Sequence, residues 1–469
     1  MAIAPTAPRE VLASVENGRT LPGSWYTDPH IHALEKERIF RRFWQYVAPR
    51  DRVATPGDFV TARLGDVPVI VTRDEHGALG GFVNVCCHRG SEVVTEACGN
   101  RRSLQCGYHA WTYGLDGRLR AAPRAAENPS FNIADHRLTP IRVAEWGPFV
   151  FVCLDPDGPE LSEQLGELPG LIDATGLDIS TVRYRDTIEY EIQSNWKIVV
   201  ENFSECYHCP LTHPKLSGLL EIDEYRVLEY PYFSTHVAPI KETARQGEEV
   251  GDWTADWDVD TGARYGSFNY LWPNFMVNVY PGPGNVSTNI IIPLGPEKTL
   301  AVYEFFYADD VVESDANEIR ELIDLVQRED VPLCESVQRG AASGYFTQGT
   351  LIESRENGVA HFQRLVASSL AAEHMDLSAA PPVLCLHVDD NVGVVLDHVT
   401  AGMQLAIENR RLAAAGDIPQ GHKVALEAIA DGGDVRKYGV VIGRATAAIR
   451  AGEHVHVHNI ESTRLRGDR

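Results

Sequence analysis

The sequence predicts an α+β protein of several domains, in which a small all-β domain precedes a larger domain with an antiparallel sheet and covering helices. Three observations predict this class. Short segments of alternating apolar and polar residues are separated by glycine-rich turns, as at 57–85. Segments with the apolar spacing of helices follow at 195–206 and 315–340. The length of 469 residues corresponds to roughly three domains at about 150 residues each.

Changes in composition place the predicted domain boundaries. The alternating pattern typical of short strands ends at the turn Asp155 to Pro159. A proline-containing linker, Ala379 to Pro382, precedes a final set of predicted strands that are separated by glycines. We therefore expect four parts, namely a helical arm at 1–39, a small β domain at 40–155, an α+β domain at 156–378, and a linker with a small β-rich domain at 379–469.

Within the α+β domain, the pattern predicts a strand at 184–192 and a strand-like aromatic run at 268–280. The helix that begins at Asn195 should end or kink before Pro210, because proline lacks the backbone N–H that a helix interior needs. The helix at 315–340 should be interrupted at Pro332 for the same reason.

Charge and cysteine content exclude several classes of protein. The chain has 42 Lys and Arg against 66 Asp and Glu, a net charge of −24 that argues against a nucleic-acid binder. Residues 156–380 alone carry 14 basic and 38 acidic groups, and 14 − 38 = −24. No apolar stretch of membrane-spanning length or secretion signal is visible, so we expect a cytoplasmic protein that does not bind membranes. Nine irregularly spaced cysteines favour metal ligation or buried thiols over a disulfide framework.

The strongest signal in the sequence is a pair of cysteine–histidine motifs. Cys86-x-His88 is followed after 17 residues by Cys106-x-x-His109. Such a set could hold zinc, but it also suits a two-iron two-sulfur cluster in which two thiolates bind one iron and two imidazoles bind the other. The pattern and its strand-rich surroundings resemble the Rieske family. Cys87 and Cys98 lie outside the ligand pattern and are expected to be packed thiols.

A second candidate metal site lies at 195–213. His208 and His213 would point about 140° apart on an unbroken helix, but the break at Pro210 lets the second imidazole turn back toward the first. Two imidazoles and one carboxylate, with open positions, form the ligand set of a ferrous centre that activates dioxygen. The carboxylate need not be local. On a helical wheel of 315–340, Asp330 lies nearer than Glu329 to the centre of the apolar face, which is defined by Leu322, Ile323, Val326, Leu333 and Val337. Because Pro332 blurs the phase beyond it, Glu329 remains the alternative.

Together the two motifs resemble the catalytic subunit of Rieske non-haem iron oxygenases over roughly residues 40–376. The resemblance implies a helix-grip-like catalytic domain, a Rieske cluster held by the four Cys and His residues, and a mononuclear Fe(II) held by His208, His213 and Asp330. It also implies that Glu205 bridges His208 to His109 of a neighbouring subunit in a ring-like homotrimer. Because no flavin or nicotinamide fingerprint is evident, we expect electrons from NAD(P)H to arrive through a separate flavin or iron–sulfur reductase.

The stretch Glu205-Cys-Tyr-His-Cys209 is similar to the branch of this family that acts on quaternary ammonium compounds. This similarity implies O2-dependent hydroxylation beside nitrogen, or N-demethylation, of a small betaine-like substrate. Aromatic faces bind such cations because the quaternary nitrogen cannot donate a hydrogen bond. The candidate aromatic residues, each of which could equally belong to the sheet core, are Phe268, Tyr270, Trp272, Phe275 and Tyr280.

The C-terminal segment resembles the SAF-type domain of altronate and related sugar-acid dehydratases. The resemblance rests on 389–391, 418–425, 437–444 and 449–459. His454, His456 and His458 alternate there as on one strand face, where they could bind a metal or form a polar outer surface. The segment leaves two alternatives open: an oxygenase that acts on a small hydroxylated or sulfonated acid, and a sugar-acid lyase or binding protein whose Rieske part only transfers electrons.

Overall fold

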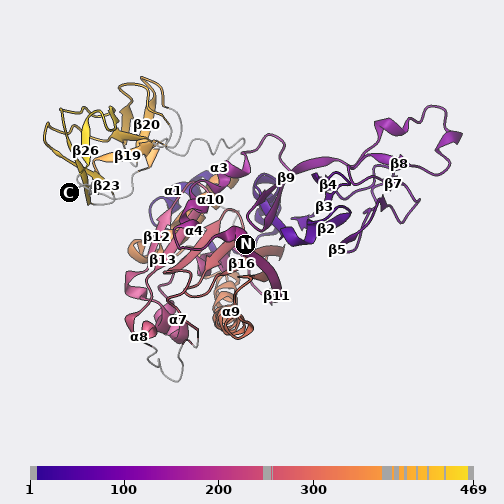
Figure 1. The fold of residues 1–469 in the computed structure, drawn as a ribbon, viewed down its shortest axis with the longest axis horizontal. Coiled ribbons are helices and arrows are strands. Elements are labelled where there is room, and N and C mark those ends of the chain that lie inside the picture. The colour runs from indigo at the N-terminus through magenta and orange to yellow at the C-terminus, as the bar shows by residue number, and fades with distance from the viewer. Residues whose placement is uncertain are drawn as a thin grey trace. The chain divides into compact units, whose positions relative to one another are not determined.

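The computed structural model describes residues 8–246, 255 and 257–371, and a C-terminal set at 383–384, 390–395, 399–407, 410–419, 422–437 and 440–462. The chain divides into two compact units, residues 1–373 and 374–469. The first unit contains a helical arm and two large antiparallel sheets with helices, whereas the second consists of short strands (Figure 1). Among the described residues, no helix has the length and apolarity needed to cross a membrane.

The N-terminal arm contains α1 (Pro8–Val15) and α2 (Pro29–Glu35). Asp28 caps α2, because its carboxylate accepts a hydrogen bond from the N–H of His30 at 2.8 Å. The arm does not stand alone, since α1 packs against α10 (Glu353–Ala371) at the other end of the unit's sequence.

The first large sheet has seven antiparallel strands in the order β1-β10-β9-β4-β3-β2-β5, and β6-β7-β8 form a smaller sheet. Apolar side chains from both sheets form one core cluster with Cys86 and Cys106. The strands are β1 (Gln45–Pro49), β2 (Asp58–Leu64), β3 (Val67–Arg73), β4 (Leu79–Val83), β5 (Cys98–Asn100), β6 (Leu104–Gln105), β7 (Thr112–Tyr113), β8 (Leu119–Ala121), β9 (Pro140–Trp146) and β10 (Phe149–Cys153).

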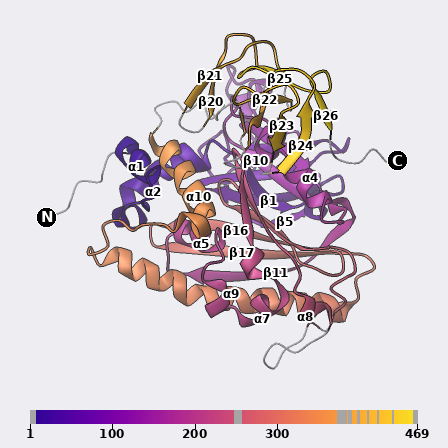
Figure 2. The ribbon, with the colours of Figure 1, turned by 90° about the vertical axis from the view of Figure 1, so that its left-hand side faces the viewer.

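The second large sheet is also antiparallel, in the order β11-β17-β16-β15-β14-β13-β12, and confirms the predicted α+β class. Figure 2 shows the long helix α9 running alongside it. The strands are β11 (Val182–Ile192), β12 (Arg226–Glu229), β13 (Phe233–Ala238), β14 (Gly266–Leu271), β15 (Phe275–Val279), β16 (Asn285–Gly295) and β17 (Lys298–Ala308). The helices are α3 (Leu161–Leu165), α4 (Leu168–Asp173), α5 (Trp196–Phe203), α6 (Cys209–Thr212), α7 (Pro214–Leu219), α8 (Glu242–Arg245) and α9 (Glu313–Ala342).

One local expectation about this domain is confirmed and two are wrong. The helix that follows Asn195, α5, ends at Phe203 and thus before Pro210, and Pro210 lies in the first turn of α6, where a helix needs no N–H from it. The run 268–280 is not one strand but a hairpin, β14 and β15, that turns at Trp272–Pro273. The helix α9 continues through Pro332, since buried side chains on both sides of that residue hold it against the fold.

A buried ion pair fixes α5 to the N-terminal arm. Lys197 on α5 pairs with Glu35 on α2, and both side chains are 0% exposed. Trp196 Nε1 donates a hydrogen bond to the second oxygen of Glu35 at 2.8 Å. Asn195 caps α5 by accepting from the N–H of Lys197 at 3.0 Å. These contacts set the position of α5 and of the loop that follows it.

The C-terminal unit is built from short antiparallel strands around two small apolar clusters. Its sheets are β18-β19-β22-β25, β20-β21 and β23-β24-β26. The strands are β18 (Val383–Leu384), β19 (Val392–Val395), β20 (Gln404–Ile407), β21 (Arg410–Ala413), β22 (Lys423–Ala425), β23 (Asp434–Lys437), β24 (Val440–Ala445), β25 (His454–Val455) and β26 (Ile460–Ser462).

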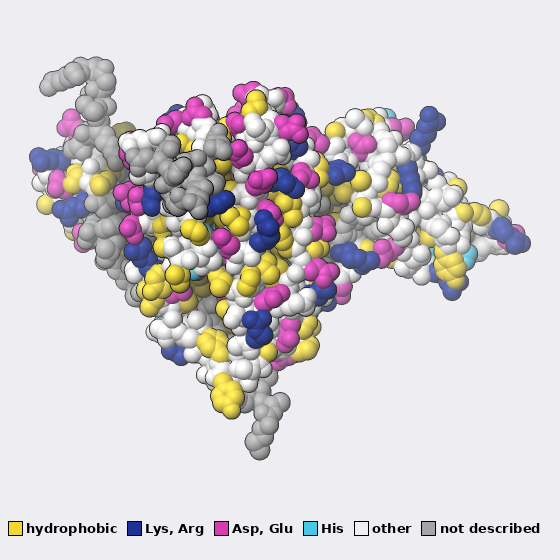
Figure 3. All heavy atoms as spheres, turned by 90° about the horizontal axis from the view of Figure 1, so that it is seen from below, with side chains coloured by type: hydrophobic (Ala, Val, Ile, Leu, Met, Phe, Trp, Pro, Cys, Tyr) yellow, Lys and Arg dark blue, Asp and Glu magenta, His cyan; other side chains and the backbone are white. Residues whose placement is uncertain are grey.

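The excess negative charge does not mark one patch on the face shown in Figure 3, where Asp and Glu side chains lie among basic and apolar ones. Several acidic groups on the described surface are paired with arginine. Arg41 contacts Asp66 at 3.0 Å, and Arg73 contacts Glu145 at 2.7 Å. Net charge alone therefore does not locate a binding site.

Candidate metal centres

The two cysteine–histidine motifs form matching loops in the small β domain. In the first loop, the N–H of Gly90 donates to the carbonyl of Cys86 at 3.0 Å, and in the second the N–H of Ala110 donates to the carbonyl of Cys106 at 3.0 Å. Gly90 and Ala110 both have positive φ, at 76° and 57°, which closes each turn. The second loop connects β6 and β7, so the small sheet positions it.

Each loop buries its thiol and exposes its imidazole. Cys86 and Cys106 are each 2% exposed, whereas His88 and His109 are exposed with ring centroids 4.7 Å apart. Burial raises the pKa of Cys106, but the N–H groups of Tyr108 and His109 outweigh it and lower that pKa, which favours a thiolate. Two buried sulfurs and two surface imidazoles fit the two-thiolate, two-imidazole ligand set that a Rieske-type cluster would need.

Two aromatic side chains support these loops. Tyr113 places its hydroxyl 3.1 Å from the Cys86 sulfur and 3.2 Å from the Cys87 N–H. The ring of Trp111 stacks on His88 at 4.6 Å with an interplanar angle of 6°. Sequence reasoning missed both residues, although each lies within a few positions of Cys106-x-x-His109.

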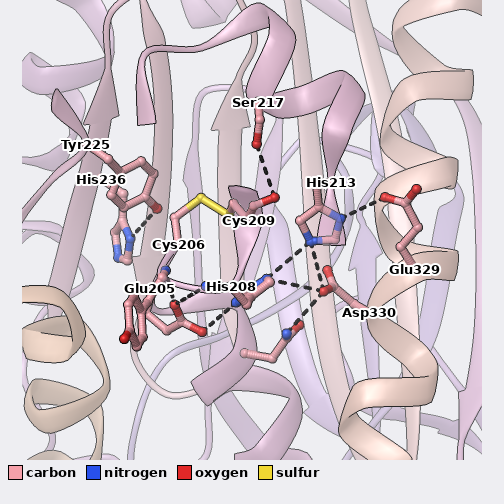
Figure 4. Close-up of a disulfide and its surroundings, with 12 residues drawn as sticks. Glu205, Cys206, His208, Cys209, His213, Ser217, Tyr225, His236, Glu329 and Asp330 are labelled. Carbon is pink, nitrogen blue, oxygen red and sulfur yellow. Dashed lines mark hydrogen bonds and ion pairs between the residues drawn. A yellow bond between two sulfur atoms is a disulfide. The ribbon is translucent and has the colours of Figure 1, made fainter. Parts of the chain in front are cut away.

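The expectation that Cys87 and Cys98 are packed thiols is wrong, because both are exposed. Cys206 and Cys209 form a disulfide, which their spacing did not predict, while the other six described cysteines are free and form no disulfide framework. Cys206 and Cys209 are both buried and they flank His208 in the chain, so this pairing shapes the loop of the second site (Figure 4).

The second site brings His208, His213 and Asp330 together (Figure 4). Nε2 of His208 lies 3.2 Å from Nε2 of His213, and Asp330 Oδ1 lies 3.4 Å and 3.0 Å from these two atoms. Donor atoms that bind one ion at about 2.0–2.2 Å lie roughly 3 Å apart, so these three atoms have the spacing of a shared metal ion. The donor set therefore fits a mononuclear iron ion.

The local sequence explains how the two imidazoles meet. His208 precedes α6, whose first turn contains Pro210, and His213 ends α6 immediately before Pro214 begins α7. The two prolines break the segment into separate short helices, so the five-residue spacing no longer turns the side chains apart. The predicted approach of His213 to His208 thus occurs, but through a new helix rather than through a kink.

Outer carboxylates hold both imidazoles by their second nitrogen. Glu205 Oε1 lies 2.5 Å from Nδ1 of His208, and Glu329 Oε2 lies 2.8 Å from Nδ1 of His213. Hydrogen bonds of this kind fix the ring orientation and tautomer of metal-binding histidines. Although burial lowers the pKa of His208, Asp330 and Glu205 outweigh it and raise that pKa to about 9.

The helix α9 separates the two candidate carboxylates. Asp330 is 8% exposed and faces the imidazoles, with Asn202 donating to its Oδ1 at 3.1 Å, whereas Glu329 reaches only the far nitrogen of His213. Leu333 and Val337, which we placed on the buried face, are exposed. The helical wheel therefore agrees with the burial of Asp330 but misjudged the face of the helix beyond Pro332.

A cavity adjoins Asp330 between α5, the central strands and α9. Of the five predicted aromatic candidates, only Tyr280 is among its lining residues; Phe268, Tyr270 and Phe275 are buried in the sheet, and Trp272 is buried in the turn between β14 and β15. The cavity is lined by Val199, Asn202, Phe203, Met276, Asn278, Tyr280, Asn289, Ile291, Tyr303, Ile323, Val326, Gln327 and Asp330. Asp330 is the single charged residue in this lining.

Comparison with known families defines the class. Residues 43–133 match the Rieske [2Fe-2S] domain, 179–372 match the ring hydroxylating alpha subunit (catalytic domain), and 381–463 match the altronate/galactarate dehydratase SAF domain. The chain belongs to the family of Rieske non-haem iron monooxygenases, and a Rieske cluster and a mononuclear iron are its cofactors.

Particular relatives are enzymes named for quaternary ammonium substrates. The chain is 36% identical to the chloroplastic choline monooxygenase of Arabidopsis thaliana over 351 residues, 71% of this chain and 79% of that protein. It is 30% identical to the carnitine monooxygenase oxygenase subunit of Acinetobacter pittii, over 77% and 97% of the two chains. The crystal structure of the quaternary ammonium Rieske monooxygenase CntA in complex with L-carnitine matches with a TM-score of 0.67 at 27% identity, over 78% and 99% of the two chains. Since one relative is chloroplastic, a cytoplasmic location stays a prediction.

Proposed function

We propose that this monooxygenase hydroxylates a carbon beside the nitrogen of a small quaternary ammonium compound, with loss of the oxidised group where that carbon is an N-methyl. The observation that carries the proposal is the cavity beside Asp330. Its lining carries the aromatic rings of Phe203, Tyr280 and Tyr303 and, among the described residues, no basic side chain that would repel a cation. Aromatic faces attract an ammonium ion that has no hydrogen-bond donors.

The rest of the lining favours a substrate whose other end is neutral. No Lys or Arg is present in the described lining to pair with a substrate carboxylate. Four amides are present instead, and the buried Oδ1 of Asn278 has no hydrogen-bond partner while its Nδ2 donates to Asn289 at 3.1 Å. An unpaired buried acceptor favours a hydroxyl donor. An amino alcohol such as choline therefore fits better than a zwitterion such as carnitine or glycine betaine.

A substrate comparison tests this assignment. The purified holoenzyme, supplied with a reductase and NADH, is assayed for oxygen consumption and oxygenated product with choline, carnitine, glycine betaine and a sulfonated hydroxy acid. We expect choline to give the highest kcat/KM. Higher turnover of the hydroxy acid would contradict the quaternary ammonium proposal, and preference for carnitine would contradict only the neutral end group.

Substitution of Tyr280 tests the aromatic contact. Tyr280→Leu removes the ring, and loss of one cation–π contact of about 1–2 kcal/mol raises KM for choline roughly 5- to 30-fold. Tyr280→Phe keeps the ring and is the matched control. An equal KM in both variants would show that Tyr280 does not hold the cation.

We propose roles for the metal-site residues from their geometry. Cys86, His88, Cys106 and His109 bind the cluster, and His208, His213 and Asp330 bind the iron. When bound, the cluster supplies electrons and the iron supplies the position where dioxygen is activated next to the cavity. Glu205 and Glu329 hold the imidazoles in place, and Asn202 orients Asp330.

We further propose that Glu205 links His208 to the partner subunit's His109 in a homotrimer. Within one chain, β7 and β8 beside the cluster loops lie well apart from α7 beside the iron ligands (Figure 1). Both sites carry exposed apolar side chains suited to an interface, with Tyr108 55%, Tyr207 61% and Leu211 92% exposed. A quaternary ammonium Rieske monooxygenase similar to this chain is described as using inter-subunit electron transfer. A separate reductase supplies the electrons.

Mixing two inactive variants tests the shared site. Cys106→Ser lacks the cluster and Asp330→Ala lacks the iron site, so neither protein alone turns over. After the two proteins are dissociated and reassembled together, subunits with an intact cluster lie beside subunits with an intact iron site, and activity should return. If electrons stay within one chain, the mixture remains as inactive as its parts.

A further inference from the structure

The C-terminal unit gathers four histidines at one end of a strand pair. In the β22–β25 pair, Lys423 lies opposite Val455 and Val424 lies opposite His454. Continuing this register by one residue places His422 opposite His456. Since side chains alternate along a strand, His454 and His456 share a face with His422. His458 lies in the turn that follows.

Three of the rings lie close to one another, and the fourth, that of His458, lies close to His454. Nδ1 of His422 lies 2.9 Å from Nε2 of His454. The ring of His456 stacks on His422 at 4.5 Å and lies 5.5 Å from His454, and the ring of His458 lies 5.2 Å from His454. Two nitrogens that bind one ion at about 2.0–2.1 Å lie about 2.9–3.4 Å apart, so the first two imidazoles already have the spacing of a shared metal.

The backbone that carries these rings is fixed. Asn459 donates from Nδ2 to the carbonyl of His454 at 2.9 Å, and its Oδ1 accepts from the N–H of His456 at 3.0 Å. The N–H of Ile460 closes the turn on the carbonyl of His456 at 3.1 Å. A preformed turn reduces the ordering that ligand binding requires. His456 is partly exposed and His458 is exposed, so an ion can enter from solvent.

The chemistry of the donors indicates the class of metal. Imidazoles without a carboxylate select zinc, copper, nickel or cobalt over calcium or magnesium.

We propose that His422 and His454, with His456 or His458 as a third ligand, bind one divalent late transition-metal ion in the C-terminal unit. A polar outer surface would not need four imidazoles at ring-contact distance around one strand end. This ion is separate from the iron and the cluster, and the proposal does not depend on the oxygenase substrate.

Metal analysis of the untagged holoenzyme tests the site. The protein, with its iron and sulfide contents measured, is incubated with Zn2+, desalted and analysed again. We expect one additional zinc per subunit with the iron content unchanged. The double variant His422→Gln/His454→Gln should lose this zinc and keep its iron, whereas His76→Gln, which removes an exposed histidine of the first unit, should behave as the wild type. Equal zinc retention in the double variant, or none in the wild type, would overturn the proposal.

Single substitutions keep the test independent of folding. His456→Gln and His458→Gln leave the β22–β25 pairing intact, and loss of the third ligand should weaken zinc affinity by more than the roughly tenfold effect of losing an outer partner. Bound Cu2+ should show nitrogen hyperfine coupling in its electron paramagnetic resonance spectrum, with fewer nitrogens in the affected variant. Unchanged affinity and spectra in both variants would refute a three-histidine site.

Discussion

Removal of the Glu329 carboxylate should weaken iron binding without affecting the cluster. This side chain is 25% exposed and accepts a hydrogen bond from His213 at 2.8 Å. Hydrogen bonds to charged groups contribute about 1.5–3 kcal/mol, and partial exposure favours the lower half of this range. A loss of about 1.5–2 kcal/mol in Glu329→Ala corresponds to a roughly 10- to 30-fold lower affinity for ferrous iron. Glu329→Gln keeps an oxygen acceptor and should stay within about threefold of the wild type.

The assay is anaerobic competition for iron against a ferrous chelator, with the visible spectrum of the cluster as an internal standard. Glu321→Ala is the control, since it removes an exposed carboxylate from the same helix. If Glu329→Ala retains iron as tightly as Glu321→Ala does, Glu329 does not support His213. If the cluster spectrum is lost as well, the effect is global unfolding and the reasoning fails.

Three further predictions concern buried and bridging groups. Lys197→Met leaves Glu35 buried without its partner, so the free energy of unfolding in urea should fall by about 3–5 kcal/mol. Adding Glu35→Gln to the same chain should restore part of this free energy, and no restoration would contradict the pairing. Burial raises the pKa of Glu201 to about 7 from 4.5, so the native state holds this proton more tightly and the wild type loses stability as the pH rises from about 4.5 to 7. Because Glu201 is half-buried, the free energy of unfolding of Glu201→Gln should exceed that of the wild type by about 1–2 kcal/mol more at pH 7 than at pH 4.5, with no further increase above pH 7. A difference that does not depend on pH would refute this. Glu205→Gln should keep both metals but slow reduction of the iron site in single-turnover experiments, and unchanged turnover would remove its bridging role.

The candidate metal residues could be predicted because their signals are local. Cys86 and His88 lie two residues apart, and the prolines that follow His208 indicate, from the sequence alone, that the helix is broken there. The burial of Asp330 could be predicted from helical phase, since its neighbours on the buried face repeat every three to four residues. The helical wheel predicted the buried face wrongly beyond Pro332, where Leu333 and Val337 are exposed. The reason is that apolar character alone does not indicate which face of a helix packs against the sheet.

Features that depend on tertiary packing could not be predicted. Glu329 and His213 lie 116 positions apart, and their hydrogen bond exists only because α9 packs beside α7. The turn at Trp272 within an apolar run, and the selection of Tyr280 alone to line the cavity, likewise depend on which strands become neighbours. The periodicity of a sequence indicates whether a segment is a helix or a strand, but not which other element packs against it.

The disulfide beside the iron site has a consequence for how the enzyme is handled. Cys206 and Cys209 close a ring of only four residues, and constraint of so short a loop stabilises the whole protein by only about 2 kcal/mol. Its main effect is therefore local, on the backbone that carries His208. Reduction of this bond would free that backbone, so we expect iron retention, rather than thermal stability, to vary between preparations made with and without thiols.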